Sequence, residues 1–235
     1  MMTLFPSVGS TRRVGEPIHE VRLTASLEGS IGRLVKPGPG RSVFVVAEAE
    51  APIGRPDVAV VVVAQGVVSR YMNSGVRLPN VTAAKLVLTR DDSLNPAAVT
   101  DHRARVRKEL ERSGWTYAQA RRLSSAVRDT LAVEAKVRDW RAGLRQVTRF
   151  RRDFSCSALL LPSRPASAQF DEALGMYGCG LLVEDRGRIR WDREAQRIEP
   201  PNWANLWMLE LVARGLEKGT AYRATSRSKR ESASE

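Results

Sequence analysis

Residues 131–150, LAVEAKVRDWRAGLRQVTRF, join a short apolar run to a segment with helical spacing. Side chains alternate along a strand, so Glu134 and Lys136 point to one face while Val133 and Val137 point to the other. A charge pair at the end of an apolar strand is costly to bury unless it has partners or a function. These residues leave two interpretations: a salt-bridged strand end at the surface, or a site that uses both charges.

The segment after this strand, residues 138–153, has the spacing of an amphipathic helix. It carries two stripes, one with Trp140, Leu144, Val147 and Arg151 and the other with Gly143, Gln146 and Phe150. A helix with two such stripes can pack on a sheet with one and present the other to a partner.

The flanking sequence predicts an α/β protein with a mixed sheet. Upstream, we expect a helix in 17–35 and strands at 42–50 and 57–64, because "KPGPG" and "APIGRP" separate these runs. Four successive valines at 60–63 indicate a central strand covered on both faces. Downstream, the pattern predicts strands at 155–162 and 175–185, a turn into a short edge strand at 186–191, and a closing helix at 200–219.

Residues 66–129 interrupt this core, which we expect to be discontinuous, with parts at 17–65 and 130–219. "TDHRARVRKELERSGW" predicts a helix with Thr100 as N-cap and Gly114 after its end. With the helix expected after it, the insert resembles a helix-turn-helix or winged-helix unit in outline. The remaining residues, 1–16 and 220–235, are expected to be flexible termini.

The charge balance favours a polyanionic partner. The 235 residues carry a formal net charge of +12, and residues 101–152 hold fifteen Lys or Arg against six Asp or Glu. We expect phosphate contacts from the basic residues of the insert. These residues are Arg103, Arg105, Arg107, Lys108, Arg121 and Arg122.

Other features limit the location of the protein and its metal chemistry. Cys156 and Cys179 fall in predicted apolar strands, which suits a reducing cytoplasm. No apolar run reaches the 18 residues that a membrane helix needs, so we expect no membrane partner. With His19 and His102, these cysteines lack the spacing of zinc ligands.

A second carboxylate stands at the start of the valine-rich strand, where Asp57 follows Pro56. If this strand lies beside the strand ending at Glu134 and Lys136, two carboxylates and one ammonium converge. Hard divalent cations such as Mg²⁺ prefer oxygen ligands of this kind, with water and substrate phosphate completing the shell. A lysine beside such an ion can stabilise charge that develops on a phosphoryl group.

Together, "GRPD" at 54–57, "VEAK" at 133–136 and "GLRQVTRF" at 143–150 resemble the PD-(D/E)xK nuclease superfamily. The resemblance implies a restriction-endonuclease-like α-β-β-β-α-β core with a helical insertion. It implies metal binding by Asp57 and Glu134, with Mg²⁺ or Mn²⁺, and a catalytic role for Lys136. Gln146 and Phe150 are similar to the helix motif QxxxY, with Phe in place of Tyr. A further glutamate from the first helix is implied, for which we take Glu28, while Glu20, Glu48 and Glu50 stay open.

The leading functional hypothesis is a metal-dependent DNA endonuclease whose insert engages the duplex. The alternative is a non-catalytic DNA-binding regulator on a degenerate nuclease fold, and a weaker one is an RNA-binding or membrane-surface protein. The sequence leaves open whether DNA or RNA is cut, and in which pathway. It also leaves the oligomeric state open, although cutting both strands of a duplex with one site per chain calls either for two copies, as in a homodimer, or for two cleavage events.

Overall fold

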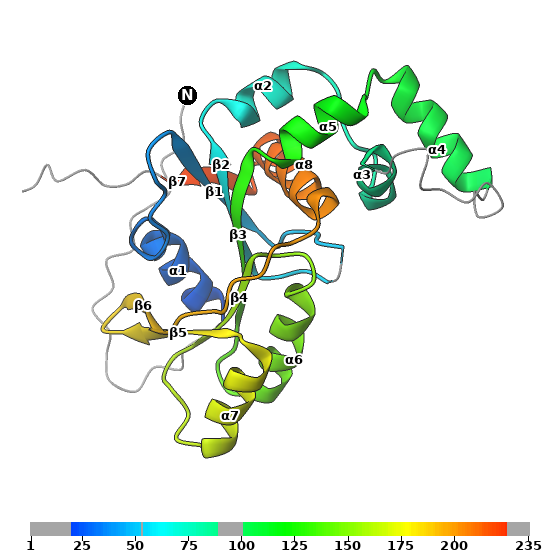
Figure 1. Cartoon of the computed structure of the whole chain (residues 1–235). Coiled ribbons are helices and arrows are strands. Elements are labelled where there is room, and N and C mark those ends of the chain that lie inside the picture. The colour runs from blue at the N-terminus through cyan, green and yellow to red at the C-terminus, as the bar shows by residue number, and fades with distance from the viewer. Residues whose placement is uncertain (1–19, 53, 89–100, 225–235) are drawn as a thin grey trace, which may run out of the picture.

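The structure is a computed structural model that describes residues 20–52, 54–88 and 101–224. Within them, a mixed seven-stranded sheet lies between helices, as expected for the α/β class (Figure 1). The strands are β1 (Arg41–Ala47), β2 (Val58–Ala64), β3 (Val127–Ala135), β4 (Cys156–Leu161), β5 (Gly180–Asp185), β6 (Arg188–Arg193) and β7 (Ala221–Ala224). The helices are α1 (Glu20–Leu34), α2 (Val67–Asn73), α3 (Val81–Val87), α4 (Asp101–Arg112), α5 (Tyr117–Ser124), α6 (Trp140–Phe150), α7 (Ala168–Tyr177) and α8 (Asn202–Lys218).

The strand order across the sheet is β6-β5-β4-β3-β2-β1-β7. β2 runs antiparallel to both β1 and β3, whereas β3, β4 and β5 run parallel. β6 and β7 add antiparallel edges. This order places the predicted acidic strands β2 and β3 side by side near the middle of the sheet.

The valine-rich strand β2 is covered on both faces, as its unbroken apolar run predicts. Val58, Val60 and Val62 face α1, whose buried residues include Leu23 and Leu27. The opposite face packs against α8 over β1 to β3 and against α6 and α7 over β4 and β5. The result is a three-layer arrangement in which, among the described helices, α1 covers one side of the sheet and α6, α7 and α8 cover the other (Figure 1).

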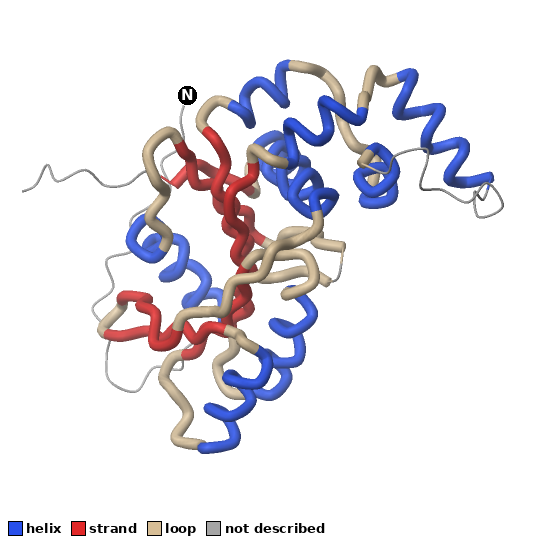
Figure 2. Tube along the Cα trace, viewed as in Figure 1, coloured by secondary structure: helices blue, strands red, loops and turns tan. Residues whose placement is uncertain are grey.

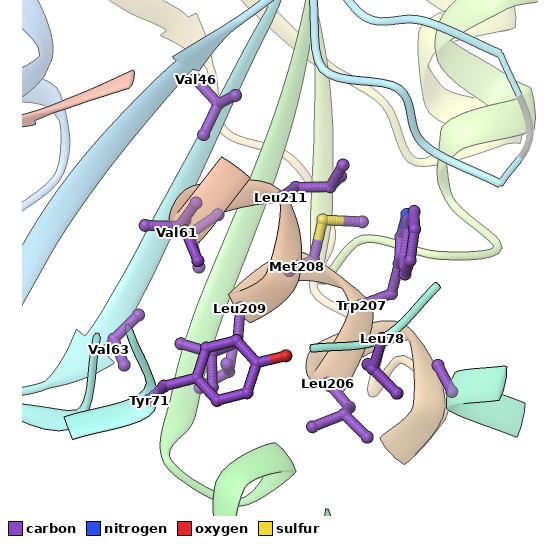
Figure 3. Close-up of a cluster of buried hydrophobic side chains, with 14 of the residues drawn as sticks. Val46, Val61, Val63, Tyr71, Leu78, Leu206, Trp207, Met208, Leu209 and Leu211 are labelled. Atoms are coloured by element: carbon purple, nitrogen blue, oxygen red, sulfur yellow. The ribbon is translucent and has the colours of Figure 1, made fainter. Parts of the chain in front are cut away.

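The insert between β2 and β3 is helical in its described part, which contains α2, α3, α4 and α5 (Figure 2). Asn80 and Thr116 cap α3 and α5 by accepting main-chain hydrogen bonds, which satisfies otherwise unpaired N–H groups. The insert shares one buried cluster with α8 and the sheet, and Figure 3 shows Tyr71 and Leu78 of the insert beside Leu206 and Leu209 of α8. α4 extends outward from this packed region (Figure 1).

Four local predictions need correction. Helix α7 occupies residues for which no helix was predicted, and the strand expected at 175–185 begins only at Gly180. Strand β7 pairs with β1 inside the segment expected to be a flexible terminus. The first strand ends at Ala47, because Glu48 takes a left-handed turn conformation with φ of 46°. The predicted N-cap Thr100 lies outside the described residues.

No helix in the described ranges is long and apolar enough to cross a membrane.

Candidate active site

Strands β2 and β3 bring Asp57 and Glu134 to the same edge of the sheet. Their register pairs Val58 with Val133, so Asp57, just before β2, lies across from the end of β3. The Oδ2 atom of Asp57 accepts a hydrogen bond of 2.7 Å from the main-chain N–H of Ala135, the residue after Glu134. The long insert therefore leaves this pairing intact and returns the chain to it.

Lys136 completes the group that the sequence predicts. Its main-chain N–H donates to the carbonyl of Leu160 on β4 at 3.0 Å, so strand geometry continues past the end of β3. Its Nζ lies 2.8 Å from Oε1 of Glu134. The Glu134 side chain is only 2% exposed and that of Lys136 18% exposed, so this ion pair is largely shielded from water. The pair is thus not the solvent-exposed surface bridge that was the simpler interpretation.

The structure brings Glu20, and not Glu28, to this group. Oε2 of Glu20, in the first turn of α1, lies 3.6 Å from Nζ of Lys136. Glu28 lies about 12 Å further along the helix axis, at 1.5 Å per residue. Its charge acts instead on Tyr222 of β7, whose pKa is raised mainly by burial and further by Glu28. We therefore replace Glu28 by Glu20 in the candidate site.

Burial governs the protonation of the two carboxylates. It raises the pKa of Asp57, although the hydrogen bond from Ala135 and the charge of Lys136 act in the opposite direction. Burial likewise raises the pKa of Glu134, opposed by the hydrogen bond from Lys136 and reinforced by the charge of Asp57. A cation between the half-buried Asp57 and the buried Glu134 would relieve the repulsion between these two acids.

The pKa of Lys136 is raised despite its burial, which alone would lower it. The hydrogen bond and charge of Glu134, helped by Glu20 and Asp57, outweigh the cost of desolvation. Lys136 is therefore a cation at neutral pH. In this state it can donate hydrogen bonds and stabilise negative charge, but it cannot accept a proton.

The other two open candidates, Glu48 and Glu50, lie on the exposed loop before Asp57. Both pair with Arg55, at 3.8 Å and 3.1 Å. The charge of Glu48 contributes to the raised pKa of Asp57, after burial, so this residue borders the site. They form a rim and, unlike Glu20, have no ion pair with Lys136.

Helix α6 packs against the stem of Lys136 through Gly143. A Cβ atom at position 143 would lie 2.8 Å from Cγ of Lys136 and 2.5 Å from Cδ1 of Leu159. Gln146 is half-buried one turn further along and has no hydrogen-bond partner among the described residues. Phe150 is buried and contacts the loop near Gly54. The helix therefore packs against Lys136, and Gln146 forms no hydrogen bond with this lysine.

We expect Gly143→Ala to lower the free energy of unfolding by about 1–3 kcal/mol, because the methyl group overpacks this contact. It should also slow any reaction that needs Lys136, since the stem must move. Gly29→Ala is the matched control: Gly29 is helical too, with nothing within 4 Å of an added Cβ. That change should stabilise the protein by roughly 0.5–1 kcal/mol. Urea unfolding of both variants checks the prediction, and equal effects of the two would contradict it.

The predicted DNA-contacting residues are placed only in part. Lys108 on α4 and Arg121 and Arg122 on α5 are exposed. The side chains of Arg103, Arg105 and Arg107 lie outside the part of the structure that is described. The exposed basic side chains of α5, and Lys108 of α4, are therefore accessible to a partner. For the three arginines of α4, an exposed basic surface stays a prediction.

Comparison with known proteins adds little. No family model and no curated protein matches the chain. Among solved structures, the SPO1766 protein of unknown function from Silicibacter pomeroyi is similar, with 12% identity and a TM-score of 0.42 over 88% of this chain and 90% of that one. The function must therefore be argued from the site itself.

Proposed function

We propose that the protein is a metal-dependent nuclease that hydrolyses phosphodiester bonds, with DNA as its expected substrate. The observation that carries the proposal is the hydrogen bond from Ala135 to Asp57 beside the buried pair of Glu134 and Lys136. It joins two strand ends, separated by 76 residues of sequence, into one group of two carboxylates and an ammonium. These are the residues that the nuclease resemblance singles out.

The element order gives independent support. With the insert left out, α1, β1, β2, β3, α6 and β4 follow one another as the resemblance to PD-(D/E)xK nucleases implies. The antiparallel β2 lies between β1 and β3, and β4 continues the sheet in parallel. In this chain, as in the arrangement that the resemblance implies, the two acidic positions and the lysine lie at the ends of adjacent strands.

The acidic pair fits a hard divalent cation. Oε2 of Glu134 is buried and has no hydrogen-bond partner, and the Ala135 N–H engages only one Asp57 oxygen. Within the described ranges, no group of three or more His, Cys, Asp or Glu is arranged to hold an ion. Mg²⁺ commonly takes one or two carboxylates and fills the remaining positions with water and substrate phosphate. Asp57 and Glu134 would therefore hold Mg²⁺ or Mn²⁺ as a pair.

A bound Mg²⁺ would supply a Lewis acid and lower the pKa of a coordinated water. The chain contributes the rest. Lys136, kept protonated by Glu134 and Glu20, can hydrogen-bond to a phosphoryl oxygen and stabilise the charge that develops on it. Glu134 is buried, where the effective dielectric constant is lower than in water, so the charges around it interact more strongly than they would in water.

The direct test is incubation of the protein with supercoiled plasmid, linear duplex, single-stranded DNA and RNA, in Mg²⁺ or Mn²⁺ and in chelator. We expect metal-dependent cleavage of at least one polynucleotide, and none by Lys136→Ala prepared in parallel. A wild-type protein that binds DNA but cleaves none of these substrates would contradict the proposal. It would favour the DNA-binding regulator, with Glu134 and Lys136 retained as a structural ion pair.

A further inference from the structure

Five arginines lie along the side of α6 that faces away from the sheet. The helix buries Gly143, Leu144, Val147 and Phe150. Arg141, Arg145 and Arg149 of the helix are exposed, as are Arg138 just before it and Arg152 just after it. We call these five residues the α6 arginine face. Residues four apart share one side of a helix, so the three central arginines form a row about 12 Å long.

Within the described residues, the central part of the α6 arginine face has no ion-pair partner, a property that it shares with other exposed arginines such as Arg121 and Arg122. Among the described residues, Arg55, Arg77, Arg164, Arg190, Arg197 and Arg214 all form ion pairs. By contrast, Arg138, Arg141, Arg145 and Arg149 form none within that part of the chain. Residues 138–153 contain six arginines and two acids. Asp139 caps α6 with its side chain, and Asp153 is buried and interacts with the charge of Arg152. A row of exposed arginines, Arg141, Arg145 and Arg149, that has no acidic partner among the described residues is available to an external anion.

The remaining contacts hold the face in place and leave it accessible. The guanidinium of Arg141 stacks over Trp140 at 4.4 Å and donates to Gln169 of α7 at 3.2 Å. Arg151 points elsewhere, because it donates to the carbonyls of Gly178 and Gln196. Arg151 thus has a structural role, whereas the five arginines of the face form no hydrogen bonds to main-chain carbonyls among the described residues.

The position of α6 connects this face to the candidate site. The helix begins four residues after Lys136, and Gly143 on its inner side contacts the Lys136 stem. Because one short helix carries both contacts, an anion on its outer side lies within a helix diameter, about 10–12 Å, of the layer that holds the site. A polymer with regularly spaced negative charges can span that separation.

We propose that the α6 arginine face binds the phosphate backbone of the nucleic acid that the candidate site cleaves. The inference rests on the proposed function for naming the bound polymer as substrate. Guanidinium groups suit this task because they remain charged and form bidentate bonds with phosphate oxygens. A membrane surface fits less well, since the apolar side of α6 is buried against the sheet and cannot enter a bilayer.

The test measures binding in EDTA, where no cleavage intervenes, with a fluorescein-labelled 30-base-pair duplex and the matching single strand. The variant is the double change Arg145→Gln and Arg149→Gln, which keeps side-chain length and helix propensity. The control is Arg186→Gln with Arg188→Gln, which removes the same charge from exposed positions at the β5–β6 hairpin. Thermal unfolding of both doubles verifies that they fold.

We expect the α6 double to weaken binding and to reduce the slope of log affinity against log salt by about two units for the duplex. The control should change the slope by much less. Equal slopes for wild type and the α6 double would overturn the inference, as would wild-type binding to phosphatidylserine vesicles without binding to either oligonucleotide. The proposed function is judged separately, by wild-type cleavage in Mg²⁺ or Mn²⁺. Absence of cleavage with an altered slope would leave the binding face standing.

Discussion

Asp57→Asn is expected to lower metal-dependent cleavage by roughly 10²–10³-fold or more while leaving the fold intact. The amide oxygen of Asn can still accept the hydrogen bond from Ala135, so the local structure is kept and only the charge is lost. A neutral ligand cannot balance a divalent cation together with the single charge of Glu134. Single-turnover cleavage of the preferred substrate measures the effect.

The matched control is Asp129→Asn. Asp129 lies near the opposite end of β3, where it pairs with Arg197 at 2.6 Å. This change removes the same charge from the same strand without touching the candidate site, so cleavage should stay near the wild-type rate. Equal losses in both variants would show that net charge on β3, and not the metal site, controls the reaction.

The same Asp57→Asn change should stabilise the metal-free protein. Burial raises the pKa of Asp57 above its usual value near 3.9, so the folded state holds this proton more tightly than the unfolded state does. The carboxyl then favours folding only at low pH, and this contribution is lost as pH rises through the folded-state pKa. We expect Asn to raise the melting temperature at pH 7 and to give no gain below about pH 4. A lower melting temperature at pH 7 would contradict this assignment.

The largest effect on stability should come from Glu210, which joins α8 to the insert. This carboxylate is 1% exposed. It accepts hydrogen bonds from Arg214 at 2.7 Å, from the N–H of Leu78 at 3.2 Å and from the hydroxyl of Tyr71. Arg214 also donates to the carbonyls of Leu78 and Pro79, so the network is closed.

Glu210→Ala should lower the free energy of unfolding by about 3–5 kcal/mol, because it leaves Arg214 and the Tyr71 hydroxyl without their buried partner. Glu217→Ala on the same helix is the control, since Glu217 pairs with Arg77 and is 48% exposed. Its loss should cost at most about 1 kcal/mol. Urea unfolding measures both, and similar small values would mean that the buried network does not hold the insert to the core.

The sequence predicts the core of this fold because its strongest patterns are local. The valine run of β2 specifies a buried central strand, and "EAK" followed by helical spacing specifies β3 and α6. Asp57, Glu134 and Lys136 could be identified because each stands at a strand end, where a short motif fixes its direction. Asp57 comes close to Glu134 and Lys136 only because β2 pairs with β3. Local sequence patterns cannot predict this pairing, because the insert separates the two strands in the sequence.

Other features were not predicted from the sequence, and each has a physical reason. Helix α7 has weak amphipathic spacing, but Ser167 as N-cap and Gly178 in a left-handed C-cap conformation are signals that could have located it. Strand β7 is only four residues long and depends on pairing with β1. The choice between Glu20 and Glu28 depends on which end of α1 reaches the strand ends, and this is a tertiary property.

The central claim is that Asp57 and Glu134 together hold a divalent cation next to Lys136. Titration of Mn²⁺ into the metal-free protein, followed by electron paramagnetic resonance, counts the bound ions. We predict one site per chain in the wild type, loss of that site in Asp57→Asn, and its retention in Asp129→Asn. Equal Mn²⁺ binding by wild type and Asp57→Asn would contradict the account.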